Sequence, residues 1–168
     1  MTLRDHRSIV GIDPTPNGIA FVFFEGGELL DWAHLEGEPE DEVQLALVDR
    51  VIDGCAADVL VLEDAEAAGS KRKARMRHLL RLFALHAKKR GVRVMKVARA
   101  DVHDAWVARG STTKEATAAA IGELLPELRH IVPPKRKTGA NEAERVNIFD
   151  AASLVLHYDE TLPAELLP

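Results

Sequence analysis

The chain has few of the residues that crosslink small folds or cross membranes. A single cysteine, Cys55, among 168 residues excludes an internal disulfide and a cysteine-ligated zinc site, and it suits a reducing compartment. No apolar run approaches the roughly 18 residues of a membrane span, and the first residues lack the apolar core of a signal peptide. We therefore expect a cytoplasmic protein with no membrane partner. A chain of this length favours one domain over residues 1–168, with a loosely held tail from about residue 160.

Aromatic residues are also scarce, at 5% of the chain, and the formal net charge is −5. This acidic balance argues against a general nucleic-acid coat protein. The positive charge, however, is concentrated: residues 70–90 contain no acid, whereas a merely solvated helix usually pairs its bases with acids one turn away. The run predicts a basic face for phosphates, although a solvated helix face is the alternative. The candidate nucleic-acid-binding residues are Lys71, Arg72, Lys73, Arg75, Lys135, Arg136 and Lys137.

Hydrophobic periodicity and turn residues predict an α/β protein. Short apolar runs separated by Gly, Pro and Asn indicate strands, and apolar positions three and four residues apart indicate helices. The predicted strands are 8–12, 19–24, 29–35, 58–64 and 92–97. The predicted helices are 38–55, 70–90, 101–108, 114–125 and 142–158, with a loop at 131–141. This order favours a mixed five-stranded sheet, three antiparallel strands and then two parallel ones, covered by helices.

Two acids stand at the ends of apolar strands. Asp13 follows the first strand and Glu63 follows the fourth. Functional sites in open α/β sheets lie off the carboxyl ends of the strands, so the two carboxylates meet if these strands are neighbours. Asp64 points to the opposite face, because side chains alternate along a strand. Two other interpretations remain open: Asp13 before Pro14 also fits a simple turn, and Glu63 fits the approach to a helix.

A third acid interrupts the last predicted helix. Asp150 lies beside a stripe formed by Ile148, Ala152 and Val155, where a charge cannot easily reach water. Asn147 lies one turn earlier on the same side. The alternative is a buried aspartate that pairs with a basic side chain or caps a neighbouring helix.

Acids on three separate elements predict a metal site. The oxygen atoms of Asp13, Glu63, Asn147 and Asp150 suit two Mg²⁺ or Mn²⁺ ions. Two such ions about 4 Å apart stabilise the attacking and leaving oxygens of phosphodiester hydrolysis. Lys114, in the first turn of a helix where phosphate binds favourably, can add positive charge to that transition state.

These residues resemble a family. GIDP at residues 11–14, a strand ending in Glu63, the helix entry Gly110 to Lys114, and Asp150-Ala151 on the last helix are similar to the RuvC-type Holliday-junction resolvases of the ribonuclease-H-like nuclease superfamily. The resemblance spans Ile9 to about His157. It implies a ribonuclease-H-like fold, catalytic roles for Asp13, Glu63, Lys114 and Asp150, action on branched DNA in recombination and repair, and a homodimer.

The chain departs from that family at three positions. Asn147 stands where the family usually has an acid or a histidine, Glu66 stands where it has a stacking aromatic, and His103 falls near where it often has a lysine. Asn147 therefore leaves open a second hypothesis, a degenerate nuclease fold that binds nucleic acid or a partner protein without cleavage.

Two further hypotheses come from the same superfamily. An RNA-processing nuclease would share the predicted site. A phosphotransferase of the actin and sugar-kinase type shares the first strand and its acid, but it needs two copies of the sheet.

The predicted helix at 70–90 bears on assembly, because Leu82 and Leu85 lie beside its core stripe. Packing of this helix on a second copy would cover them, whereas a loop of the same chain could do so instead.

Overall fold

The computed structural model describes residues 7–134 and 145–161. The basic residues Lys135, Arg136 and Lys137, the start of the last predicted helix and most of the predicted tail lie outside the described residues. The strands are β1 (Ser8–Thr15), β2 (Gly18–Glu25), β3 (Glu28–Glu36), β4 (Val59–Glu63) and β5 (Arg93–Val97). The helices are α1 (Asp41–Cys55), α2 (Ala74–Lys89), α3 (Arg99–Ala108), α4 (Lys114–Leu124), the 3₁₀ helix η2 (Pro126–Ile131) and α5 (Arg145–Thr161).

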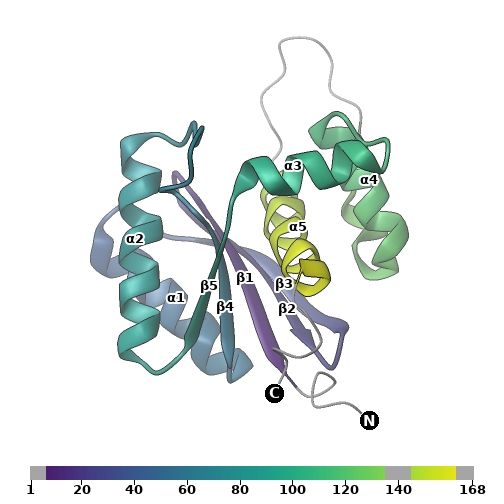
Figure 1. Cartoon of the computed structure of the whole chain (residues 1–168). Coiled ribbons are helices and arrows are strands. Elements are labelled where there is room, and N and C mark those ends of the chain that lie inside the picture. The colour runs from purple at the N-terminus through teal and green to yellow at the C-terminus, as the bar shows by residue number, and fades with distance from the viewer. Residues whose placement is uncertain (1–6, 135–144, 162–168) are drawn as a thin grey trace.

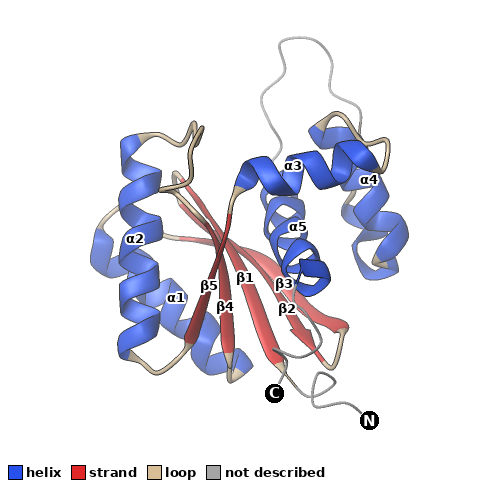
Figure 2. Cartoon of the chain, viewed as in Figure 1, coloured by secondary structure: helices blue, strands red, loops and turns tan. Residues whose placement is uncertain are grey.

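The five strands form one mixed sheet in the order β3-β2-β1-β4-β5 (Figure 2). β1, β2 and β3 pair antiparallel, and β4 pairs parallel with both β1 and β5. This confirms the predicted α/β architecture and the predicted contact between the first and fourth strands. Every residue of β1 is buried, as expected for a central strand with helices on both faces.

Helices cover both faces of this sheet (Figure 1). Helices α1 and α2 pack on one face, where Val10, Ile12 and Leu60 meet residues such as Val48 and Phe83. Helix α5 packs on the other face, with α3 and α4 beside it. None of the described helices is both long enough and apolar enough to span a membrane.

The elements of the structure differ from the predicted ones in several places. β1 does not stop before Asp13 but continues to Thr15, with Asp13 paired with Ala20. Pro14 is tolerated there because β1 pairs with β4 only from Ile9 to Gly11, so the missing N–H breaks no bond to β4. Helix α2 begins at residue 74 rather than 70, without a side-chain N-cap. The 3₁₀ helix η2 was not predicted; a proline at its first position suits a helix start.

Gly11 allows α5 to approach β1 closely. A Cβ atom at this position would lie 2.6 Å from Val155 Cγ2 and 2.8 Å from the carbonyl oxygen of Ala151. Only glycine leaves room for the backbone of α5 at this distance. This contact brings Asp150, the residue before Ala151, to the same face of the sheet as Gly11.

Candidate active site

The strand register brings two acids to one face. Gly11 of β1 pairs with Val61 of β4, and Asp13 and Glu63 each lie two residues further along their strands. Since side chains alternate, both acids point to the face of Gly11, which α5 covers. Asp150 comes to this face from α5. The side chains of Asp13, Glu63 and Asp150 are 1%, 2% and 14% exposed.

Arg99, the first residue of α3, contacts all three acids. Its Nη2 lies 3.5 Å from Asp13 Oδ1, and its Nη1 lies 3.4 Å from Asp150 Oδ1. Its Nε lies 3.2 Å from Glu63 Oε2, an ion-pair distance without the alignment of a hydrogen bond. The structure therefore gathers acids from β1, β4 and α5 around one guanidinium group.

Arg72 joins the same cluster from the loop before α2. Its Nη2 donates a hydrogen bond to Asp13 Oδ1 at 2.5 Å, and its Nε donates one to Glu63 Oε2 at 2.6 Å. Short distances of this kind are typical of charge-assisted hydrogen bonds. Asp13 and Glu63 thus each contact two arginines.

Lys114 and Asn147 lie on the Asp150 side. Lys114 begins α4, where the Thr113 side chain caps the helix by accepting a hydrogen bond from the Ala116 amide. Its Nζ donates a hydrogen bond to Asp150 Oδ2 at 3.3 Å. Asn147 is half-buried one turn before Asp150, and both residues line a groove that is described below. The alternative interpretation of Asp150, an aspartate paired with basic side chains, also describes these contacts.

Burial and charge shift the pKa values in opposite directions. Burial raises the pKa of Asp13 to about 6, helped by the nearby carboxylates of Asp150 and Glu63 and opposed by both arginines. Burial lowers the pKa of Arg99, but the three carboxylates outweigh it and the net shift is upward. The pKa of Arg72 is raised in the same way by Asp13 and Glu63. Both arginines therefore stay charged.

The donor set fits a divalent cation in chemistry, because three carboxylates and an amide offer the oxygen ligands that Mg²⁺ and Mn²⁺ prefer. In the structure, however, arginine side chains bridge these carboxylates. Within residues 7–134 and 145–161, no three Asp, Glu, His or Cys side chains are placed to hold a metal ion, and two guanidinium groups lie between the carboxylates. The predicted metal ligands thus converge, while the metal itself stays a prediction.

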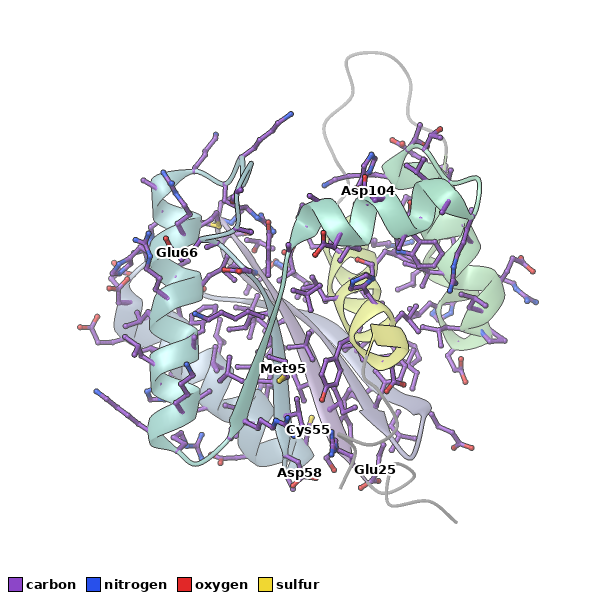
Figure 3. All side chains as sticks on the ribbon, in the orientation of Figure 1. Glu25, Cys55, Asp58, Glu66, Met95 and Asp104 are labelled. Atoms are coloured by element: carbon purple, nitrogen blue, oxygen red, sulfur yellow. The ribbon has the colours of Figure 1, made fainter. Side chains whose placement is uncertain are left out.

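Glu63 and Asp150 line a groove of about 980 Å³ at the carboxyl ends of β1 and β4, and Asp13 is buried beside them. One wall is the loop 67–72 and the other comes from α3, the start of α4, and α5. Glu66 and Asp104 lie at this end of the molecule, on opposite sides, and Asp58 and Glu25 lie at the other end (Figure 3). His103 and Trp106 also line the groove, so α3 contributes to its wall.

The predicted nucleic-acid-binding residues fall into two groups. Lys71 and Lys73 are exposed, Lys71 lines the groove, and neither forms an ion pair with a described residue. Arg72 points into the acid cluster instead. Arg75 donates a hydrogen bond to Asp41 at 2.6 Å.

Two other bases of the stretch 70–90 also pair with acids elsewhere in the fold. Arg81 pairs with Glu66, and Arg90 pairs with Asp49 and Asp53 of α1. The absence of acids within residues 70–90 therefore did not indicate a wholly unpaired basic face. The acids that pair with these bases come from α1 and from the loop after β4, and spacing along the chain could not reveal them.

Sequence reasoning also missed Arg99. It follows β5 at the same edge of the sheet as the ends of β1 and β4, so the rule that pointed to Asp13 and Glu63 could have pointed to Arg99 as well.

Comparison with known proteins identifies the class of fold. No protein-family profile and no curated protein sequence matches the chain. Among solved structures, Thermus thermophilus RuvC matches with a TM-score of 0.61 and 17% identity, over 90% of this chain and 93% of that one. The same protein in complex with a Holliday junction substrate matches with a TM-score of 0.62 and 16% identity, over 92% and 93%. The fold is thus the ribonuclease-H-like fold of RuvC.

A second resolvase has the same fold. The yeast mitochondrial Holliday junction resolvase Ydc2 matches with a TM-score of 0.57 and 13% identity, over 89% of this chain and 77% of that one. The resemblance to RuvC-type resolvases that the sequence predicted is therefore confirmed for the fold.

Proposed function

We propose that the protein is a metal-dependent endonuclease that hydrolyses phosphodiester bonds in branched DNA, as RuvC-type resolvases do. The observation that carries the proposal is the contact of one guanidinium, that of Arg99, with carboxylates from β1, β4 and α5. Acids that are 50 or more residues apart in the chain are brought into one cluster beside a groove, on a fold shared with a junction resolvase. Burial of carboxylates is costly unless a cation or a donor group meets them.

Asp13, Glu63, Asn147 and Asp150 would hold two Mg²⁺ or Mn²⁺ ions, and Lys114 would act beside them. Bound divalent ions would supply a nucleophilic water and stabilise charge on the leaving oxygen. Asp13 and Glu63 are held by the rigid ends of β1 and β4, so their carboxylates are preorganised. Lys114 Nζ, next to Asp150, can place positive charge near a phosphate in the groove.

The basic residues nearest the groove would bind the DNA backbone. Lys71 and Lys73 are the described candidates, with Lys135, Arg136 and Lys137 outside the described residues. Neither group has interleaved aromatics for base stacking, so we expect contacts to phosphates.

A homodimer is part of the proposal, because a branched substrate with two equivalent strands calls for two sites. Leu85 of α2 is 59% exposed and Leu82 is half-buried. Packing of α2 on its copy would cover Leu85. Sedimentation equilibrium at micromolar concentration tests this: a monomer would contradict the dimer and would weaken the preference for a junction over a simple strand.

The decisive experiment is cleavage of labelled four-way junction, flap, duplex and RNA substrates with Mg²⁺ or Mn²⁺ and with EDTA, beside an Asp13→Asn variant. We expect cleavage of the junction that needs metal and that the variant loses. Preference for RNA would favour an RNA-processing nuclease of the same superfamily. Metal-independent cleavage, or equal activity of the variant, would contradict the proposal.

A second candidate is a protein of this fold that binds branched nucleic acid without cleaving it. Two observations favour it: Asn147 is a weaker, neutral ligand, and Arg72 and Arg99 already neutralise the acids. Junction binding without cleavage, together with no calorimetric signal for Mn²⁺, would identify this function instead.

A further inference from the structure

The acid cluster contains its own positive charge. Three carboxylates, of Asp13, Glu63 and Asp150, contact three cationic side chains, of Arg72, Arg99 and Lys114. In metal-free protein this pairing offsets the repulsion among the acids, which would otherwise be strong in a buried site. The cluster is thus compensated as it stands.

The arginines use the same oxygen atoms that a metal would need. Asp13 Oδ1 contacts the Nη2 atoms of both Arg72 and Arg99, and Glu63 Oε2 contacts the Nε atoms of both. A divalent cation bound to these oxygens would lie beside two guanidinium groups, and like charges at such short range repel strongly. Metal and arginine therefore cannot both keep these contacts.

The two arginines have room to leave. Arg72 lies in the loop before α2 and Arg99 begins α3; both side chains line the groove, and they are 21% and 33% exposed. Each can swing toward the groove on its own side-chain torsions while Asp13 and Glu63 stay on their strands. A guanidinium that enters the groove is also suited to bidentate contact with a phosphate.

We propose that Arg99, with Arg72, is a resident counter-ion that competes with the divalent cation for the carboxylates, so that metal enters the site only as these arginines withdraw. This inference rests on the proposed metal-dependent function and makes Arg99 a positioning residue. It predicts that removal of the guanidinium strengthens metal binding, a change in affinity that a purely structural role would not produce.

The test is calorimetric titration of the full chain with Mn²⁺, comparing wild type with Arg99→Gln. The control is Arg81→Gln, which removes the same charge from an exposed pair with Glu66 outside the groove. We expect Arg99→Gln to bind Mn²⁺ about tenfold more tightly or more, since a charge-assisted contact no longer competes. The control should stay within about twofold of wild type, because exposed charges are screened by solvent.

Thermal unfolding provides a second readout. Arg99→Gln should lower the melting temperature of the metal-free protein, and saturating Mn²⁺ should raise that temperature more in the variant than in wild type. If Arg99→Gln does not fold, Arg99→Lys keeps the charge but cannot bridge three carboxylates, and it should bind Mn²⁺ a few-fold more tightly than wild type.

The outcomes separate this inference from the proposed function. Unchanged or weaker Mn²⁺ binding in the Arg99 variants, with normal binding in wild type, would overturn the competition and leave the proposed function intact. Binding in Arg99→Gln alone would support the competition. Folded wild type and folded variants that all fail to bind Mn²⁺ would overturn both.

Discussion

Among the described residues, carboxylates and cations cluster beside the groove and also on the outer side of α1 and α2. In the groove, Asp13 is almost completely buried and contacts Arg72 and Arg99. On the outer side, Asp41 accepts hydrogen bonds from Arg75 at 2.6 Å and from His78 at 2.7 Å, and it is exposed to solvent. A similar cluster at Asp49 receives hydrogen bonds from His86 and Arg90.

Basic partners accompany opposite net shifts of the aspartate pKa in the two places. Hydrogen bonds from His78 and Arg75 lower the pKa of Asp41. Burial raises the pKa of Asp49, but His86 and Arg90 lower it by more, so the net shift is downward. In the groove, burial outweighs two arginines and raises the pKa of Asp13 to about 6. Desolvation therefore decides whether a paired carboxylate is stabilised as an anion.

The largest expected effect is on cleavage, and it should differ between variants of two glutamates that lie three residues apart. Glu63→Gln should lower cleavage of a labelled junction by about a thousandfold, since the variant would lose a proposed metal ligand that is buried beside the groove. Glu66→Gln, which removes an exposed carboxylate paired with Arg81, should stay within about twofold of wild type. Single-turnover cleavage with Mn²⁺ measures both. Similar losses in the two variants would break the distinction between groove and surface.

A second comparison uses glycines beneath the two clusters. Gly11→Ala should lower the free energy of unfolding by about 1–3 kcal/mol, because the new Cβ meets Val155 and the backbone of Ala151 below 3 Å. Gly54→Ala in α1 meets nothing within 4 Å and should raise that free energy by about 0.5–1 kcal/mol. Urea denaturation tests both values. Equal effects would mean that α5 does not rest on Gly11 as described.

The pH dependence of stability should differ between the clusters. Asp13 binds its proton more tightly in the folded chain, where its pKa is about 6, than an ordinary aspartate with a pKa of 3.8, so in EDTA its penalty on folding is full above pH 6 and fades toward pH 4. The free energy of unfolding of wild type relative to Asp13→Asn should therefore rise by on the order of 1–3 kcal/mol as pH falls from 7 to 4.

Asp49 should behave in the opposite way. Its pKa is lowered, so its contribution is present above pH 3.8 and is lost as pH falls below that value. The difference between wild type and Asp49→Asn should stay flat from pH 7 to 5. Denaturation series at each pH test both variants, and a flat profile for Asp13→Asn would show that burial does not dominate in the groove.

The smallest expected effect concerns DNA binding. Lys71→Ala should weaken junction binding and lower the salt slope by about one unit, since one phosphate contact is lost. Arg75→Ala should change the slope little, because Arg75 already pairs with Asp41. Fluorescence anisotropy in EDTA from about 50 to 200 mM salt measures the slopes. Equal slopes for the two variants would show that pairing with Asp41 does not withhold Arg75 from DNA.

Local patterns were enough to predict most of the fold. Short apolar runs bounded by turn residues placed all five strands, and the apolar spacing of Ile148, Ala152 and Val155 placed the last helix, because these signals lie in neighbouring residues. Strand boundaries were less accurate: Pro14 suggested an earlier end of β1. Only the pairing range with β4 explains why the strand continues to Thr15.

By itself the sequence determined which acids follow the apolar runs of the central strands, since the position of Asp13 and Glu63 relative to those runs is a property of adjacent residues. Tertiary structure alone decided their partners and their electrostatics. Arg72 reaches Asp13 across 59 residues of chain and Arg99 reaches it across 86, and the close packing at Gly11 sets the depth of Asp150. Charge pairing and desolvation depend on distances through space, which spacing along the chain does not encode.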